Sequence, residues 1–315
     1  MNVLITGGAG FIGSHLADRL LARGDRVRVI DNYATGRPDN LAPHPHLEVF
    51  EGTIADADLV ERAFSGFYPE LVVHAAAAYK DPHAFVEDVL TNVLGTIQVV
   101  QAAERHGASR LVYFQTALCY GLHPLEQPIT LSHAIRPEGS SYAYSKTAGE
   151  QYLDLSGIPH VTFRLANAYG PRNLSGPLPT FYQRLTTGKP CYVSDTRRDF
   201  IFIDDLVETV LACIDRPHVT GAYHISSGRD FAIKELFDAT MAALGIELAA
   251  PVEVRPRNPD DVYTILLDPS KTHEAFGGDH VKTPLETGVA RAIAWYRDHD
   301  VNATYTHLKL EATPK

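Results

Sequence analysis

A glycine-rich turn between an apolar run and a helical pattern constrains this chain more than any other feature. The turn is Thr6-Gly-Gly-Ala-Gly-Phe-Ile-Gly13, and the helical pattern that it opens ends at Ala22. Gly7 allows a tight turn, Gly10 lets the backbone approach a pyrophosphate, and Gly13 lets the helix pack closely on the strand. A helix that begins at such a turn presents free N–H groups to phosphates. The context therefore predicts a dinucleotide-binding loop rather than an ordinary glycine turn.

The first half of the chain alternates short apolar runs with amphipathic stretches. Near-continuous Val, Ile and Leu runs indicate strands buried on both faces, and the alternation indicates a parallel sheet covered by helices. We expect an α/β fold with a doubly wound parallel sheet of the Rossmann type, followed by a smaller mixed α/β portion. The expected strands are 3–6, 27–31, 47–52, 71–76, 111–116 and 161–170, and the expected helices are 11–22, one from about 56, 84–106, 140–155, 204–215, 231–244 and 284–299.

The turn-rich segment 173–180 marks a change in the character of the chain. We expect a Rossmann domain that binds NAD over residues 1–170, with strand and helix contributions from about 200–228. Residues 171–315 are expected to form a mainly substrate-binding domain, with the substrate in the cleft between the two.

The composition narrows the classes of partner and compartment. The 315 residues carry 28 Lys and Arg against 38 Asp and Glu, a formal net charge of -10, which argues against a nucleic-acid binder. Three Cys cannot form a disulfide framework and indicate a reducing compartment. The N-terminus has no basic leader, and no apolar stretch approaches the roughly 20 residues of a membrane span. We expect a cytoplasmic protein that binds neither nucleic acid nor a membrane.

The acidic residue after the second expected strand bears on the choice of cofactor. Asp31 ends that strand, 18 residues after Gly13. A carboxylate there accepts hydrogen bonds from the adenosine ribose hydroxyls and repels the 2′-phosphate of NADP. Arg37 is close enough in sequence to offer a site for that phosphate, but we favour NAD. The 15 His residues show no metal-ligand spacing, so no catalytic metal is expected.

A Tyr–Lys pair supplies a candidate for proton chemistry. Tyr142 and Lys146 are four residues apart on an expected helix and so share a face, whereas the nearby Tyr144 is followed at that spacing by Ala148. A phenol is a poor base at neutral pH, and a nearby ammonium favours its phenolate. Thr116 ends the fifth strand, where a hydroxyl points into the crevice in which ligands of such sheets bind.

Several motifs in register carry a family resemblance over nearly the whole chain. They are TGGAGFIG, the strand-end DN at 31–32, VVHAAA, TNVLGT at 91–96, QTALCYG, SYAYSK, FRLANAYGPR at 163–172, RRDFIFIDDL at 197–206 and YHISSG at 223–228. Together they resemble the extended short-chain dehydrogenase/reductase family, in particular its nucleotide-sugar epimerase/dehydratase branch.

The resemblance implies a role for each matching residue. Tyr142 matches the catalytic base, Lys146 its partner and nicotinamide-ribose ligand, and Thr116 the third member of the triad. The implied cofactor contacts are Gly7, Gly10, Phe11, Ile12, Gly13, Asp31, Asn32, Thr53, Ile54, Ala75, Ala76, Asn92, Tyr142 and Lys146. The implied substrate contacts are Thr116, Asn167, Arg198, Arg257 and Asp261.

The implied diphosphate grip leaves two points open. Arg198 matches an arginine that clamps the phosphates, with a surface ion pair to Asp199 as the alternative. A second arginine is usual in a later segment, where the best register places Asn258, with Arg257 next to it. Either Arg257 substitutes for that arginine or the grip is weaker.

The two residues after Thr116 separate the reactions of the family. Dehydratases that it resembles carry Asp and Glu there, and UDP-glucuronate decarboxylases carry Glu at the second position, whereas this chain has Ala117 and Leu118. Neither side chain transfers a proton, which resembles the 4-epimerases. We expect an NAD-dependent 4-epimerase of a UDP-linked hexose, N-acetylhexosamine or hexuronate. The alternatives are a dehydratase or 4-ketoreductase of the same family. A non-catalytic NAD-binding protein is the least favoured alternative. The helices at 84–106 and 140–155 resemble the pair that joins subunits in this family, which implies a homodimer.

Overall fold

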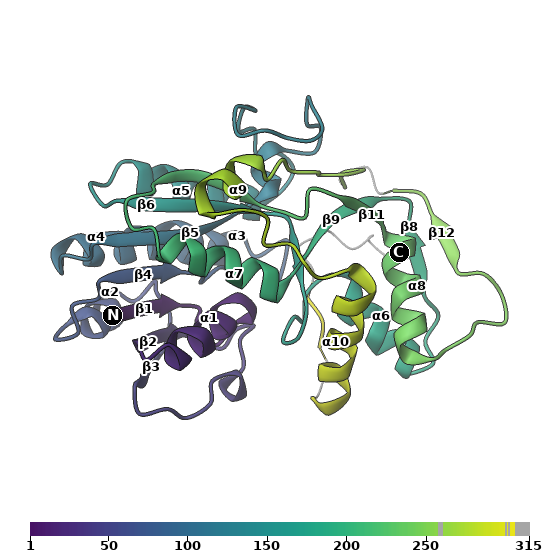
Figure 1. The fold of residues 1–315 in the computed structure, drawn as a ribbon, viewed down its shortest axis with the longest axis horizontal. Helices are drawn as coiled ribbons and strands as arrows, with labels where there is room; N and C mark the ends of the chain where they lie inside the picture. Colours follow the sequence, from purple (N-terminus) through teal and green to yellow (C-terminus); the bar gives the residue numbers. More distant parts are fainter. Residues whose placement is uncertain (258–260, 300, 302, 306–315) are drawn as a thin grey trace.

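Seven parallel strands form the central sheet of the protein, in the order β10-β6-β5-β4-β1-β2-β3 (Figure 1). A computed structural model describes residues 1–257, 261–299, 301 and 303–305. The strands are β1 (Asn2–Thr6), β2 (Arg26–Asp31), β3 (Leu47–Glu51), β4 (Leu71–His74), β5 (Arg110–Thr116), β6 (His160–Leu165) and β10 (Gly221–Ile225). The expected doubly wound α/β fold is confirmed.

Helices cover both faces of the sheet because successive strand side chains point to opposite sides. On β1, Val3 and Ile5 join the core on one face and Leu4 joins the core on the other. The first face is covered by α1 (Phe11–Ala22) and α7 (Ile203–Ile214), which pack on each other. The second is covered by α2 (Ala57–Phe64), α4 (Thr96–Arg105) and α5 (Ser141–Asp154).

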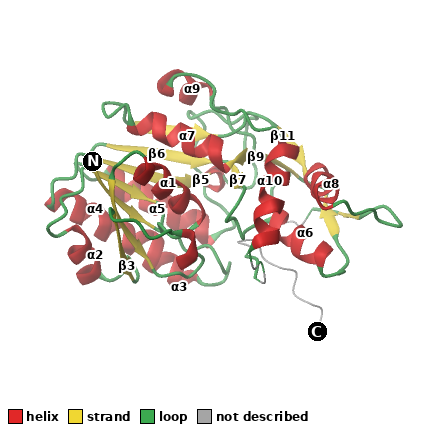
Figure 2. Cartoon of the chain, turned by 60° about the horizontal axis from the view of Figure 1, so that its bottom comes forward, coloured by secondary structure: helices red, strands yellow, loops and turns green. Residues whose placement is uncertain are grey.

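A second lobe stands beyond one end of the sheet (Figure 2). Its helices α6 (Pro177–Thr186), α8 (Ile233–Leu244) and α10 (Leu285–Asp298) pack on one another. It also contains the three-stranded sheet β11-β9-β7 and the pair β12-β8. These strands are β7 (Asn167–Tyr169), β8 (Tyr192–Ser194), β9 (Arg197–Phe202), β11 (Asp230–Ala232) and β12 (Glu253–Arg255).

The chain passes between the two lobes more than once. β7 belongs to the second lobe although it precedes residue 171, whereas α7, β10 and α9 (Ser270–Phe276) return to the first, where α9 packs on β10. Each lobe is therefore built from more than one segment of the chain.

Three sequence expectations differ from the structure in detail. The expected strand 161–170 is two strands, because Ala166 still donates its N–H to Ile225 of β10 whereas Asn167 pairs with Phe200 of β9. The turn-rich segment 173–180 contains the start of α6, where Gly176 has a positive φ and Pro177 takes the first helical position that suits proline. The expected helix 84–106 consists of α3 (Phe85–Asp88), a π-helical segment at 89–95 and α4.

No helix in the described part of the chain is long and apolar enough to cross a membrane. Within the same residues, no group of three or more His, Cys, Asp or Glu side chains could hold a metal ion.

We predict that Gly149→Ala destabilises the protein although alanine favours helices. A Cβ atom at Gly149 of α5 would lie 2.6 Å from Oη of Tyr113 and 2.7 Å from the carbonyl oxygen of Asn92. Overpacking of this kind costs about 1–3 kcal/mol, which urea unfolding monitored by circular dichroism would measure. The control is Gly157→Ala, whose Cβ would lie 3.7 Å from its nearest neighbour, Oε1 of Glu104. Equal stability of the two variants would contradict the prediction.

Candidate active site

A cavity of about 930 Å³ opens where β1 and β4, neighbours in the sheet, lead to helices on opposite faces. In doubly wound sheets, ligands bind outside the carboxyl ends of the strands at this switch point. The cavity is lined by residues that end or follow β1, β2, β3 and β4, by the last residues of β5 and the start of α5. On the far side it is lined by residues 165–169, 173 and 175–178.

The glycine loop leaves the cavity wall without side chains next to the first turn of α1. Gly7 has a φ of +69°, and a Cβ there would lie 2.7 Å from the backbone nitrogen of Ala76. A Cβ on Gly13 would collide with the carbonyl oxygen of Gly7. Gly7, Gly10, Phe11, Ile12 and Gly13 all line the cavity, as a pyrophosphate at a helix N-terminus requires.

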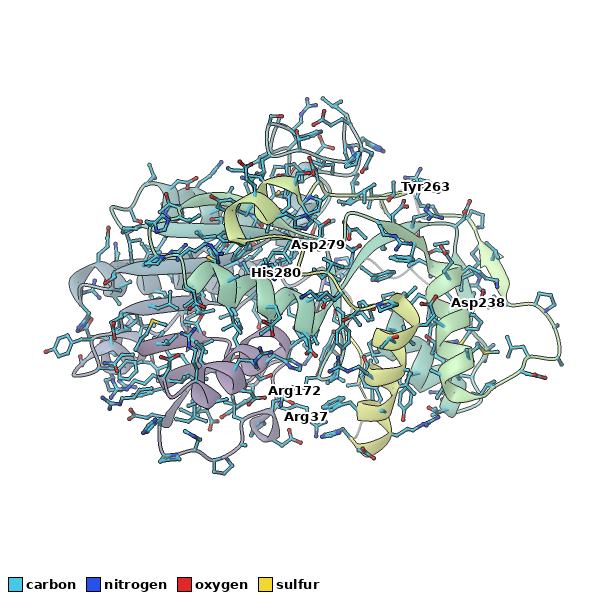
Figure 3. The ribbon with its side chains drawn as sticks, viewed as in Figure 1. Arg37, Arg172, Asp238, Tyr263, Asp279 and His280 are labelled. Atoms are coloured by element: carbon cyan, nitrogen blue, oxygen red, sulfur yellow. The ribbon has the colours of Figure 1, made fainter. Side chains whose placement is uncertain are left out.

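Asp31 lies at the adenosine end expected from the sequence. Its Oδ2 accepts a hydrogen bond from N–H of Ala9 at 2.8 Å, and its Oδ1 accepts one from N–H of Tyr33 at 2.8 Å. Loss of solvation on burial raises the pKa of the Asp31 carboxyl, although these backbone bonds oppose the shift. Asn32 also lines the cavity. Arg37 pairs with Asp39 at 2.6 Å and lies at the lower edge of the molecule, outside the cavity lining (Figure 3).

The loops after β3 and β4 supply the opposite wall. Thr53, Ile54, Ala75 and Ala76 line the cavity as expected. Asn92 does not: it is 1% exposed, outside the lining, and part of the π-helical segment.

Asn92 holds the wall from behind. Its Oδ1 accepts N–H of Ala78 at 2.8 Å, and its Nδ2 donates to the carbonyl of Ala78 at 3.0 Å and to Oγ of Ser145 at 2.9 Å. Its amide thus joins the loop after β4 to α5. The sequence marks Asn92 through its motif but not this orientation, which depends on the π-helical turn.

His74 ties the two central strands to the same segment. Thr96 donates its hydroxyl proton to the carbonyl of Asn92, so it accepts one from Nε2 of His74 at 2.9 Å. Nδ1 of His74 therefore accepts from the hydroxyl of Thr6 at 2.6 Å. Burial lowers the pKa of His74 to about 3, which keeps the ring neutral and this arrangement fixed. His74 was not among the residues expected at the site; its place at a strand end within VVHAAA was the available signal.

Thr116, Tyr142 and Lys146 line one cavity. Ser140 caps α5, with Oγ accepting N–H of Ala143 at 3.4 Å, so that Tyr142 and Lys146 lie in the first turns of the helix. Thr116 ends β5, and its Oγ1 accepts N–H of Leu118 at 3.2 Å. The structure thus brings together the three residues that the sequence singled out.

Burial dominates the electrostatics of the Tyr–Lys pair. Loss of solvation raises the pKa of the Tyr142 phenol, and the Tyr79 and Asp88 side chains raise it further. Lys146 is 2% exposed, with Nζ 4.0 Å from the centroid of the Tyr113 ring. Loss of solvation lowers the pKa of Lys146 to about 7, against the opposing effect of Glu150. The ammonium is therefore close to losing its proton at neutral pH.

Three further residues around the cavity were not singled out from sequence. The Tyr79 ring lies 6.3 Å from that of Tyr142, and Nζ of Lys80 lies 5.1 Å from the ring centroid of Tyr305. All three line the cavity. Tyr79 and Lys80 follow β4, a position that the strand-end rule could have flagged. Tyr305 reaches the site only because its backbone bonds to Leu174 and Gly176, which no local pattern reveals.

The expected substrate contacts separate into two groups. Asn167 lines the cavity, whereas Arg198, Arg257 and Asp261 do not. Nη2 of Arg198 donates to Oδ1 of Asp261 at 2.7 Å, and Nη1 of Arg257 donates to the carbonyl of Asp261 at 2.9 Å. Asn258, the other candidate for the second phosphate contact, lies outside the described residues.

The alternative pairing of Arg198 with Asp199 is wrong. Asp199 is fully buried and accepts hydrogen bonds from Ser226, Ser227 and N–H of Leu267 instead. The reason is strand alternation: Arg198 and Asp199 are consecutive on β9, so their side chains point to opposite faces.

The turn after Thr116 carries no acid or base at its first two positions. Ala117 is buried in the core, and Leu118 is half-buried and faces a second, smaller cavity that Asp261 and Val262 also line.

A strand-end glycine loop, an acidic residue after β2 and a Tyr–Lys pair on α5 define a dinucleotide-dependent protein of the short-chain dehydrogenase/reductase class. Residues 3–226 match the model of the NAD dependent epimerase/dehydratase family, and the chain belongs to that family. The cofactor of the family is NAD, and the glycine loop and Asp31 fit it.

Solved structures of similar sequence support this assignment. WbmH of Bordetella bronchiseptica in complex with NAD+ is 51% identical with a TM-score of 0.90, and the match covers 95% of this chain and 99% of that one. WbmG of the same organism, in complex with NAD and UDP, is 45% identical with a TM-score of 0.89 over 98% of both chains.

Curated relatives differ in the reaction for which they are named. A putative UDP-glucose 4-epimerase of Methanocaldococcus jannaschii is 29% identical over 95% of this chain and 99% of its own length. UDP-glucuronic acid decarboxylase 1 of Arabidopsis thaliana is 30% identical over 96% of this chain and 71% of its own. The family to which the chain belongs thus includes relatives named for more than one reaction.

We predict that Asp31→Asn weakens NAD binding about tenfold or more. The substitution keeps the shape but removes a charged acceptor, and hydrogen bonds to charged groups contribute about 1.5–3 kcal/mol. Calorimetric titration of protein stripped of NAD would measure the affinity. Glu51→Gln serves as the control, because Glu51 is the exposed register partner of Asp31 on β3 and does not line the cavity. An unchanged affinity in Asp31→Asn would remove the ribose assignment.

Proposed function

We propose that the protein is an NAD-dependent nucleotide-sugar 4-epimerase that inverts C4 of a UDP-linked hexose, N-acetylhexosamine or hexuronate. One observation carries the proposal: Thr116, Tyr142 and Lys146 line the cavity of the glycine loop, while Ala117 and Leu118 offer no further acid or base. A reaction that needs a single proton-transfer group fits this arrangement, because removal and return of one hydroxyl proton are the only proton steps.

The chain's own residues perform the proton transfer. When bound, NAD+ would supply the acceptor for the C4 hydride and a positive charge that favours the phenolate. Tyr142 takes the C4 hydroxyl proton and later gives it back. Lys146 stabilises the phenolate electrostatically, which is needed because burial alone disfavours it. The Thr116 hydroxyl holds the sugar oxygen by a hydrogen bond at the strand end.

Inversion requires the sugar to turn while its diphosphate stays held. We assign that anchor to Asn167, which lines the cavity, and to Arg198, Arg257 and Asp261, which are bonded to one another just outside its lining. A planar guanidinium suits a diphosphate. Because Arg198 pairs with Asp261 at 2.7 Å, the phosphates must compete with this carboxylate, so anchoring includes an exchange of partners.

The decisive assay uses the purified protein, a panel of UDP-sugars and no added cofactor. We expect interconversion of one C4 pair without accumulation of reduced cofactor, because the hydride returns to the same carbon. A stable 4-keto product would indicate a dehydratase, release of carbon dioxide a decarboxylase, and a requirement for external reduced cofactor a ketoreductase. Each of these results would contradict the proposal.

We predict that Tyr142→Phe lowers kcat at least about 100-fold, the usual contribution of a general acid–base group. NAD content and thermal unfolding should stay close to wild type, because the ring is retained. The matched control is Tyr144→Phe on the same helix, whose side chain is exposed and lines the second cavity rather than that of the glycine loop. A comparable loss in both variants, or none in Tyr142→Phe, would refute the assignment of the base.

We further propose that the protein is a homodimer. α3 and the π-helical segment pack against α5, and together they expose an apolar face. Exposed apolar surface on neighbouring elements marks interaction sites. The face consists of Phe85, Val86, Val89, Leu90, Leu94 and Tyr152, which are 38–72% exposed.

We predict that the double variant Val86→Glu, Leu90→Glu is a monomer in analytical ultracentrifugation. The two residues are four apart on one helical surface, and two copies of the face would place buried carboxylates opposite each other. The control is Leu125→Glu, which introduces the same charge at a residue 76% exposed in a loop outside this face. Wild-type protein that sediments as a monomer would remove the proposal.

We also propose a cytoplasmic location. Cys119, Cys191 and Cys213 are all free thiols, which suits a reducing compartment.

A further inference from the structure

A chain of buried polar groups runs behind Thr116, Tyr142 and Lys146, and the reaction described above does not use it. It consists of Gln115, Tyr120, Glu150, Arg164 and His224, each no more than 7% exposed. We call it the buried polar chain. It joins β5, α5, β6 and β10 on the side of α5 away from solvent.

Each hydrogen bond in the buried polar chain has one possible direction. Nδ1 of His224 donates to the carbonyl of Asp268 at 2.9 Å, so its Nε2 accepts from the Tyr120 hydroxyl at 2.6 Å. Nη1 of Arg164 then donates to the same hydroxyl at 2.9 Å. Burial lowers the pKa of His224 to about 4, which keeps the ring neutral and this direction fixed.

Glu150 is the centre of the buried polar chain. Its Oε1 accepts from Nη2 of Arg164 at 2.8 Å and from Nε at 3.2 Å, and its Oε2 accepts from Nε2 of Gln115 at 3.0 Å. Oε1 of Gln115 in turn accepts the backbone N–H of Thr116 at 2.8 Å. The carboxylate is therefore two hydrogen bonds away from the backbone that carries the Thr116 hydroxyl.

Glu150 also lies on the helix face of the catalytic pair. Tyr142, Lys146 and Glu150 follow one another at intervals of four residues on α5. The carboxylate is one turn from the lysine and two turns from the tyrosine. The other titratable groups that face Lys146 are Tyr113 of β5 and the neutral His74 of β4. Glu150 is the group that opposes the loss of the charge on Lys146.

The distances along the helix decide where one shared proton lies. Consider the state in which Tyr142 and Lys146 share one titratable proton. If the proton is on Tyr142, the lysine is a neutral amine; if it is on Lys146, the tyrosine is a phenolate. A negative charge nearer to the lysine favours the second arrangement. Glu150 is one helical turn from Lys146 and two turns from Tyr142. For the charge of Glu150 alone, Coulomb's law over these two distances changes the ratio of the two protonation arrangements about tenfold.

We propose that Glu150, held by Arg164, is a positioning residue of the active site: it keeps the proton on Lys146 rather than Tyr142 and, through Gln115, fixes the strand end of Thr116. This inference rests on the proposed role of Tyr142 as the base. Arg164 has its own part, because its two bonds to Oε1 hold the carboxylate toward β6 and keep it from capturing the Lys146 ammonium.

The first test needs no substrate. In the NAD-bound protein, the near-ultraviolet absorbance of the Tyr142 phenolate is the wild-type spectrum minus that of Tyr142→Phe. We expect this difference to fall several-fold, up to about tenfold, when it is measured in the Glu150→Gln background at the same pH. Asp205→Asn is the control, since Asp205 is another buried carboxylate, bonded to Thr283 and away from the cavity. It should leave the phenolate signal unchanged.

A second test separates positioning from simple stabilisation. Replacement of both partners in Glu150→Leu, Arg164→Met removes the ion pair without leaving an unpaired buried charge, so the fold should persist even where Glu150→Gln unfolds. We expect thermal unfolding near wild type, unchanged KM and a kcat lower by up to about tenfold, because the Arg164 charge removed with Glu150 offsets part of the field of the carboxylate. Restored kcat together with restored stability would mean that the pair is only structural and would overturn the inference.

The outcomes also separate this inference from the proposed function. If wild-type protein shows the phenolate signal and Glu150→Gln leaves it unchanged, the inference about Glu150 is overturned, but the proposed function is not. A wild-type protein with that signal but without C4 inversion overturns the proposed reaction and leaves the inference standing. Absence of any Tyr142 phenolate signal in active wild-type protein overturns the assignment of the base, and the inference with it.

Discussion

The burial of one ammonium group, that of Lys146, is the constraint on which the active site depends. A charge with 2% exposure persists in a protein only where nearby groups stabilise it. Here the Tyr113 ring lies under the charge at 4.0 Å and Glu150 follows one helical turn later. The low polarity of the surroundings disfavours the protonated form of Lys146. It also strengthens the electrostatic effect of that charge on the neighbouring phenol.

Close packing behind α5 holds that geometry. Gly149 lets the helix approach the π-helical segment until no Cβ atom fits between them. Across this contact, Asn92 bonds both to Ser145 of α5 and to the loop after β4. His74 links the same segment to the ends of β1 and β4. The cofactor loop and the catalytic helix are therefore joined through one closely packed, hydrogen-bonded segment.

The cofactor side of the site could be predicted from the sequence because its chemistry is local. The glycines after β1 and Asp31 after β2 occupy strand ends, and parallel strands bring their ends to one edge. Tyr142 and Lys146 share a face as soon as their segment is helical. Thr116 lies at the same edge of the sheet as soon as its segment is a strand. The partner of Arg198 could not be predicted in this way, since Asp261 is 63 residues away and strand alternation turns Arg198 from its neighbour Asp199.

The sequence by itself determined the doubly wound sheet, the dinucleotide loop and the meeting of Thr116, Tyr142 and Lys146 at the cavity. Each depends on periodicity or on groups a few residues apart, which the chain encodes directly. Only the tertiary structure decided that Asn92 supports the cavity wall from behind, that Tyr305 reaches the site, and that Glu150 and Arg164 form a buried pair. These arrangements join different segments of the chain, so no local pattern records them. Each buried polar group must find a partner because it has lost its water, and the packing of the segments decides which partner is within reach.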